Sequence, residues 1–350
     1  MSFAASLAPP GRAFGREALT LALFALLLGV ALLAALCLGR FPVTAWRALE
    51  IIGAAARDPF AVPATMEERI VLLVRLPRVA LAALAGAGLA VAGAALQGVF
   101  RNPLVAPQVL GISPGAAFGG ALAISLGISG AALLGMAFAM GLLALLVVGL
   151  LARVGGRSEI VTVILAGMVI GALFGALVSL LQFVADPNGS LPAIVYWLMG
   201  SFGTATWLRL WLAGPGIVLG LVLLLLLRAR LNILSLEEAE ARSLGARPER
   251  ERWLIFVLVA AIVGSQVAVS GIIGWIGLVV PHAARLIVGH DHRALLPASA
   301  LLGAAFLVTV DTLARTATTA EIPLGVLTAL VGAPVFAVLL RRHYRHRFAA

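Results

Sequence analysis

The chain has 350 residues and a formal charge of +10; 62% of its residues are hydrophobic and only 11% are charged. A mean hydropathy of +1.10 excludes an ordinary soluble domain. Apolar stretches recur along the whole length, each long enough to cross a ~30 Å hydrocarbon core as a helix. All 25 basic residues are arginine, so the chain has no P-loop, which requires a lysine. If ATP drives this protein, another subunit must bind it.

The first apolar stretch, 19–39, is too long for the core of a cleaved signal peptide, so we predict a retained membrane span. It follows a cytoplasmic extension, residues 1–18, and precedes a moderately polar segment, 40–74. The further predicted spans are 79–99, 114–128, 131–151, 160–184, 207–227, 253–270, 275–289, 294–313 and 323–340.

These elements predict an all-α polytopic membrane protein with about ten transmembrane helices in one domain, 19–342. A shorter apolar helix is expected at 191–202, and a cytoplasmic tail at 343–350. With both ends of the chain in the cytoplasm, most arginines fall on the cytoplasmic side, as the positive-inside rule requires. The basic balance therefore reflects membrane topology, and we predict no nucleic-acid partner. The outer segment before the second span breaks the rule, because it too is rich in arginine.

The stretch EEAEARSLGARPERER, 237–252, concentrates charge in an otherwise apolar chain. A charge at the centre of a span costs about 2.5–3.5 kcal/mol, so we place this stretch in the cytoplasm. Ser235 is the predicted N-cap of a short helix, with Glu238 in the capping-box position, and Gly245 is the predicted stop. The stretch is either a solvated loop or a docking surface for a cytoplasmic partner.

Arginines at the outer ends of two spans have two interpretations. Arg75 and Arg78 flank Pro77 at the start of the second span; they either reach lipid phosphates or steer an acidic partner. Arg315 follows Asp311 by four residues, which favours an i,i+4 helical ion pair.

The predicted spans carry very few ionisable residues, which argues against an ion-coupled carrier and against enzyme chemistry. The five histidines include the motif HDH at 290–292. Because one His-x-His turn with a single aspartate is a weak metal signal, we predict no metal site.

Five segments in the correct order resemble the FecCD-type permeases, the type II ABC importers for iron chelates and vitamin B12. They are RLPRVALAALAGAGLAVAGAALQGVFRNPLVAPQVLGISPGAAFG (75–119), YWLMGSF (196–202), LNILSLEEAEARSLGA (231–246), GIIGWIGLVVPHAARLIVGHDHRALLP (271–297) and EIPLGVLTALVGAPVFAVLLRR (321–342). The resemblance covers about residues 20–342. It implies ten spans per chain in the inner membrane of a bacterium, and a homodimer with two ATPase subunits and a periplasmic substrate-binding protein.

The resemblance also implies roles for particular residues. The coupling helices that contact the ATPase would lie at about 231–252 and include Glu238, Arg242, Ser243, Leu244 and Gly245. The residues that dock the binding protein would be Arg75, Arg78 and Arg315. The cytoplasmic gate would lie at Ile160, Val161 and Thr162. No cofactor is expected in this chain, since the partner ATPase would bind ATP and Mg.

The expected cargo is an iron chelate, either haem or a ferric siderophore, with vitamin B12 as the alternative. Two other classes of protein stay open at this stage: an ion-coupled secondary transporter, and a receptor subunit that binds the binding protein without transporting anything.

Overall fold

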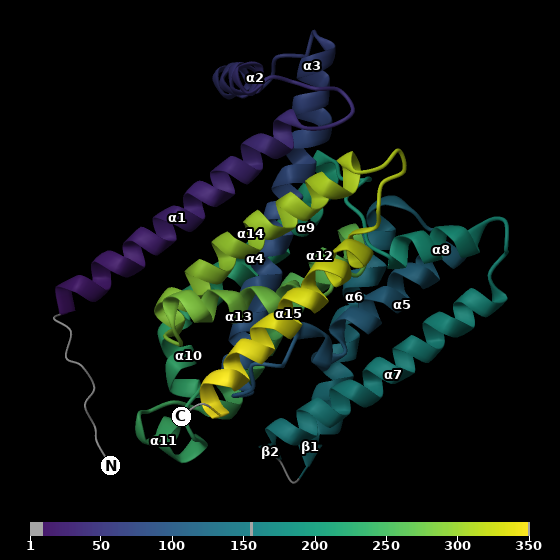
Figure 1. Ribbon diagram of the computed structural model, residues 1–350. Helices are drawn as coiled ribbons and strands as arrows, with labels where there is room; N and C mark the ends of the chain where they lie inside the picture. The colour runs from purple at the N-terminus through teal and green to yellow at the C-terminus, as the bar shows by residue number, and fades with distance from the viewer. Residues whose placement is uncertain (1–9, 155–156, 349–350) are drawn as a thin grey trace.

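The computed structural model describes residues 10–154 and 157–348, and it is built almost entirely of helices (Figure 1). Within the described residues, seven helices are long and apolar enough to cross a membrane. They are α1 (Pro10–Cys37), α4 (Leu76–Val99, continuous with α3, Met66–Arg69, and η1, Ile70–Arg75), α6 (Gly130–Ala152), α7 (Ile160–Val184), α9 (Trp207–Leu226), α12 (Pro248–Ser270) and α14 (His292–Thr316).

Three further apolar helices are shorter: α5 (Ile112–Ser125), α13 (Ile276–Val288) and α15 (Leu324–Phe348), the last apolar as far as Leu339. With the seven long helices they match the predicted spans, so the all-α polytopic fold class is confirmed. The remaining elements are α2 (Ala45–Arg57), η2 (Pro107–Leu110), α8 (Ser190–Leu198), α10 (Arg228–Leu234), α11 (Glu238–Ser243), and the antiparallel strands β1 (Arg153–Val154) and β2 (Arg157–Ser158).

Three expected boundaries differ from the structure. Helix α1 begins at Pro10, so residues 10–18 of the expected extension belong to the same helix as the first span, and residues 1–9 lie outside the described residues. The outer segment 40–74 folds into α2, α3 and η1. The expected tail, 343–350, continues α15 as far as Phe348.

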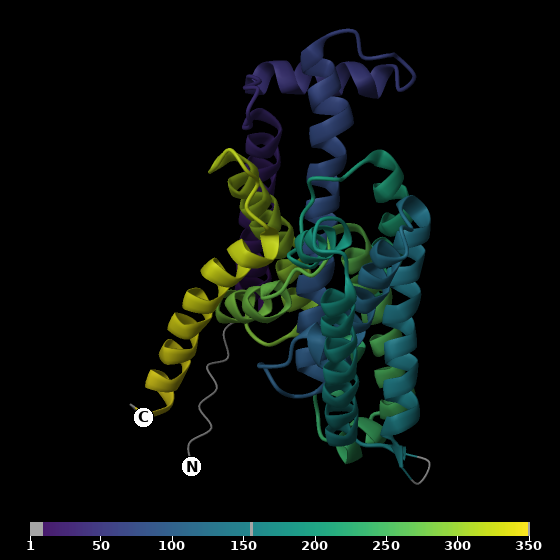
Figure 2. The same cartoon turned by 90° about the vertical axis from the view of Figure 1, so that its right-hand side faces the viewer.

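The two ends of the bundle differ in what they carry. Helices α2 and α3 lie at one end, and α10, α11 and the β1–β2 hairpin lie at the other, together with the end of α15 (Figure 1). Turned by 90°, the molecule shows α2 lying across the direction of the spans (Figure 2). This arrangement agrees with the predicted topology, in which the arginine-rich segment between α9 and α12 is cytoplasmic and α2 is outside.

Helix α4 forms the centre of the bundle, packing against α9, α12, α13 and α14. Its small residues allow backbones to meet. A Cβ atom added at Gly86 would lie 2.2 Å from the carbonyl oxygen of Gly303 on α14, and one added at Gly93 would lie 1.9 Å from that of Gly277 on α13. These glycines set how closely α13 and α14 approach α4.

We expect Gly93→Leu to reduce the yield of folded, monodisperse protein at least tenfold, because the new side chain meets a backbone carbonyl that cannot move alone. Size-exclusion chromatography of the detergent-extracted chain measures this yield. Gly175→Leu is the matched control, since Gly175 on α7 has no atom within 4 Å of an added Cβ. Equal yields for the two variants would contradict the close approach of α4 and α13.

Candidate functional site

An ion-pair cluster lies buried at the outer end of the bundle. Arg78, on the first turn of α4, donates to both carboxylate oxygens of Asp311 on α14 at 2.9–3.1 Å. It also donates to Glu321, in the link before α15, through Nη1 and Nη2 at 2.9 Å each. These hydrogen bonds from Arg78 lower the pKa of the Glu321 carboxyl below its ordinary value. Arg78 thus ties three segments of the chain together.

The other two arginines of this cluster serve the end of α1. Arg75 donates to the carbonyl oxygens of Leu36 at 2.6 Å and Cys37 at 3.1 Å. Arg315 donates to the carbonyl of Leu38 at 2.8 Å and to that of Ala35. The last carbonyls of a helix have no partner within the helix and carry the negative end of its dipole. The two guanidinium groups supply the missing hydrogen bonds and a positive charge at the end of α1.

The arginines predicted to dock a binding protein are therefore not free charges on the outer surface. Arg75, Arg78 and Arg315 are 4%, 7% and 8% exposed. The Asp311–Arg315 pair is present but loose, with 3.9 Å between Nε and Oδ2, because Asp311 faces Arg78 more closely. Their docking role stays a prediction. One sequence signal could have indicated this cluster: Asp311, an acidic residue near the end of an apolar helix.

At the cytoplasmic end, the predicted coupling segment is a pair of short helices and a turn. Glu238 and Arg242 form an exposed i,i+4 ion pair on α11, and Glu238 also lies 3.6 Å from Arg252 at the start of α12. Gly245 adopts a left-handed conformation, φ +78°, and closes α11. Leu244, beside it, is 58% exposed. The Ser243 hydroxyl donates to the carbonyl of Glu240. The exposed Glu238, Arg242 and Leu244 thus give this segment a surface of charged and apolar side chains.

The predicted capping box at Ser235 is wrong. Ser235 ends α10, where its hydroxyl donates to the carbonyl of Asn232 at 2.7 Å. Helix α11 begins two residues after the position that the box required, and Glu237, its N-cap, makes no side-chain cap bond. The physical reason is that a serine hydroxyl competes equally well for a carbonyl three residues earlier.

The predicted gate residues form the first turn of α7. Val161 is exposed, while Ile160 and Thr162 are half-buried. Ile160 lines the same small cavity as Glu238 and Arg252, so the start of α7 lies beside the coupling segment. This proximity was not apparent from the sequence, in which the two regions are far apart.

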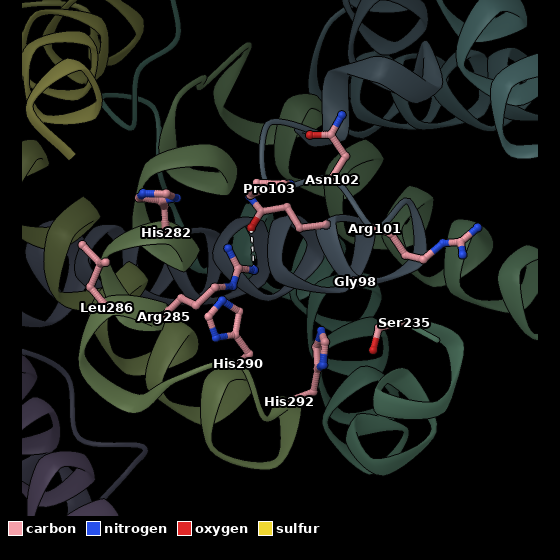
Figure 3. A pocket seen from close by; sticks show the side chains of 11 residues that line it. Gly98, Arg101, Asn102, Pro103, Ser235, His282, Arg285, Leu286, His290 and His292 are labelled. Carbon is pink, nitrogen blue, oxygen red and sulfur yellow. Dashed lines mark hydrogen bonds between the residues drawn. The ribbon is translucent and has the colours of Figure 1, made fainter. Parts of the chain in front are cut away.

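A larger pocket, of about 380 Å³, opens at the same end between α4, α13 and the start of α14 (Figure 3). Arg285 of α13 donates from Nη2 to Oε1 of Gln97 on α4 at 2.9 Å. His290 and His292 also line it. Within the described residues, no group of three or more His, Cys, Asp or Glu side chains is placed to hold a metal ion.

An apolar bundle of membrane-spanning helices with a charged segment at one end is the architecture expected of a membrane permease. The chain belongs to the FecCD transport family, whose model matches residues 26–342. It is therefore a multi-pass protein of the inner membrane and an ABC importer permease, of the kind that works with ATPase and binding-protein partners.

Relatives in this family carry different cargo names. The chain is 43% identical to the molybdate import permease MolB of Haemophilus influenzae, over 90% of this chain and 93% of that protein. It is 44% identical to the hemin transport permease HmuU of Yersinia pestis, over 79% and 84%. A solved structure described as the inward-facing conformation of a metal-chelate type ABC transporter shares its fold with a TM-score of 0.83 and 41% identity, covering 92% of this chain and 98% of that one.

Proposed function

We propose that two copies of this chain, with two ATPase subunits and a periplasmic binding protein, import a metal-bearing cargo at the expense of ATP. The iron chelates haem and ferric siderophore are the first candidates. The observation that carries the proposal is the exposed α10–α11 segment, which packs on the buried helices α4, α12 and α14 from the cytoplasmic end. Such a segment is suited to contact a separate ATPase subunit.

Motion of an ATPase bound to α11 would reach the bundle through α12. Helix α11 contacts α12, and the Glu238–Arg252 pair joins them. Helix α12 in turn packs against α4, α5, α6 and α9. A displacement of its cytoplasmic end would therefore be transmitted to these four helices. Because Ile160 lines the cavity that Glu238 and Arg252 share, the same displacement would act on the start of α7, where we place the gate, Ile160, Val161 and Thr162.

Docking of the binding protein by Arg75, Arg78 and Arg315 belongs to this proposal in a modified form. These side chains are buried and most of their donors are engaged within the chain, so an acidic residue of the binding protein would have to replace an internal partner. Glu321 is the partner most open to replacement, since its side chain is 30% exposed whereas that of Asp311 is 1% exposed. Docking would then exchange one carboxylate for another around Arg78.

Molybdate is the second candidate cargo. The relative named for molybdate import matches this chain over nearly the full length of both proteins. Vitamin B12 is an alternative, supported by the cobalamin permease BtuC of Halobacterium salinarum, 42% identical over 85% of this chain. An ion-coupled carrier is one of the two other classes; against it, the buried Asp311 is paired with Arg78 and is not placed to bind and release an ion.

The test is uptake into proteoliposomes that hold this chain, its ATPase and its binding protein. We expect ATP-dependent accumulation of radiolabelled haem or ferric siderophore, with no accumulation when ATP is replaced by a non-hydrolysable analogue. Molybdate and cobalamin are assayed in parallel, and accumulation of one of these alone would reassign the cargo while keeping the mechanism. Accumulation of any cargo without the ATPase subunit would contradict the proposal.

A further inference from the structure

The pocket at the cytoplasmic end of α4 contains the positive charge of Arg285, which has no ion-pair partner among the described residues. Arg285 reaches into it from the last turn of α13, and Figure 3 shows its side chain with those of His290 and His292 nearby. The pocket measures about 380 Å³, and a water molecule occupies about 30 Å³. It therefore has room for a small ion with part of its hydration shell.

One terminal nitrogen of the Arg285 guanidinium has a hydrogen-bond partner and the other has none among the described residues. Nη2 donates to Oε1 of Gln97 at 2.9 Å. That amide is itself fixed, because its Nε2 donates to the carbonyls of Val105 at 3.4 Å and Gly277 at 3.3 Å. Nη1 is shielded from solvent and has no hydrogen-bond partner in the described part of the chain.

No aspartate or glutamate side chain compensates this charge. All 15 aspartates and glutamates of the chain lie within the described residues, and none of them forms an ion pair with Arg285. By contrast, the buried Arg78 has two carboxylates, and Arg252 has Glu238. The buried Arg75 also lacks a carboxylate, but it donates to backbone carbonyls through both Nη1 and Nη2, whereas Nη1 of Arg285 has neither a counter-charge nor a hydrogen bond within the described chain and is unfavourable unless a ligand supplies one.

The acidic residue of this region is already engaged. Oδ1 of Asp291 accepts from the side-chain amide of Asn232 at 2.6 Å and from the backbone N–H of Arg293 at 2.8 Å. Since Asp291 can only accept, Nδ2 of Asn232 must face it, and Oδ1 of Asn232 faces His292. That oxygen accepts from the backbone N–H of His292 at 2.9 Å and lies 2.8 Å from Nδ1.

This geometry fixes the tautomer of His292. Nδ1 must carry the proton that Asn232 accepts, so Nε2 of the neutral ring has a free lone pair. His292 is 4% exposed, it lines the pocket, and its Nε2 has no partner in the described part of the chain. The pocket therefore offers a cationic donor, Arg285, and a neutral acceptor, His292.

We propose that this pocket binds a protonated phosphate group. A guanidinium matches two oxygens of a phosphate, and the P–OH of hydrogen phosphate donates to the lone pair of His292. Sulfate has a similar shape but no proton at neutral pH, so it leaves that lone pair facing an oxygen. The group is either free cytoplasmic phosphate or the monoester head group of phosphatidic acid. The site is independent of the cargo and of the proposed function.

The experiment measures binding of radiolabelled inorganic phosphate to the purified full-length chain in detergent at pH 7 and constant ionic strength. We expect saturable binding at one site per chain, with sulfate at least tenfold weaker as a competitor than unlabelled phosphate. Arg285→Gln should weaken phosphate binding at least tenfold. Arg293→Gln is the matched control, since it removes the same charge from an exposed position that does not line the pocket. His292→Phe should reduce the preference for phosphate over sulfate.

A second arm uses nanodiscs of phosphatidylcholine with or without phosphatidic acid. If phosphate does not bind but phosphatidic acid raises the melting temperature of the wild type and not of Arg285→Gln, the lipid is the source of the phosphate group. Absence of both effects, or equal competition by sulfate and phosphate, overturns the proposal. So does an Arg285-dependent association with the ATPase subunit without phosphate binding, which would assign the pocket to a carboxylate of that partner. The comparison of sulfate with phosphate uses only the wild type, so it tests the proposal even if Arg285→Gln fails to fold.

Discussion

Replacing Arg78 by leucine is expected to leave little folded permease in the membrane. The change strands Asp311, whose side chain is 1% exposed, and Glu321 without the guanidinium that both carboxylates face. Removing one partner of a buried ion pair costs about 3–5 kcal/mol. The readouts are the amount of monodisperse protein after extraction and its melting temperature, compared with those of the wild type.

A double variant separates the ion pair from simple loss of packing. Arg78→Leu combined with Asp311→Leu removes both charges, so we expect it to recover much of the loss, because burying two apolar side chains carries no charge penalty. Arg57→Leu is the control for removing an arginine from the outer surface, since Arg57 is exposed and forms no ion pair within the described residues. A single Arg78→Leu variant as stable as Arg57→Leu would show that the cluster does not hold the fold together.

The second large effect is expected at the coupling turn. Gly245→Val should lower ATP-dependent uptake at least tenfold without reducing the amount of folded chain. Gly245 has φ +78°, a conformation that costs a β-branched residue about 1–3 kcal/mol. An added Cβ has no atom within 4 Å, so the strain is relieved by moving the turn and not by a clash in the core. The exposed Leu244 would move with it, away from the ATPase.

Gly127→Val provides the matched control for this variant. Gly127 has φ +70° and also has no atom within 4 Å of an added Cβ, but it lies between α5 and α6 at the opposite end of the bundle. The same local strain is therefore placed away from the coupling segment. Equal uptake by Gly127→Val and Gly245→Val, whether reduced or not, would argue against a special role of the turn at Gly245.

Hydropathy alone was sufficient to predict the ten spans, because each helix must be apolar along most of its length to cross the membrane. Helix α2 was missed since it is short and amphipathic: it buries Ala48 and Ile51 and exposes Trp46 and Leu49. A hydropathy average over 18 residues or more hides such a pattern.

The partners of the outer arginines could not be predicted from local spacing. Arg78 meets Asp311 and Glu321 across 233 and 243 residues of sequence. The i,i+4 rule offered Arg315 as the partner of Asp311, and the tertiary contact with Arg78 prevailed because its guanidinium can bind both carboxylate oxygens at once. Likewise, the missing hydrogen-bond partner of Arg285 Nη1 can be recognised only from the structure, which shows Gln97 bonded to Nη2 and Asp291 bonded to Asn232 and Arg293.

The glycine contacts of α4 have a mechanical consequence. Where backbone meets backbone, at Gly86 with Gly303 and at Gly93 with Gly277, no flexible side chain lies between the helices to absorb a displacement. We therefore expect α4, α13 and α14 to travel as one rigid body during a transport cycle. The deformation is then expected in helices that the rest of the chain encloses less, such as α1, α7 and α9, whose spans are 11%, 28% and 28% buried, as against 83% for the span that contains α4. Changes of internal shape in this permease are thus expected at the periphery of each chain, while α4, α13 and α14 keep their mutual arrangement.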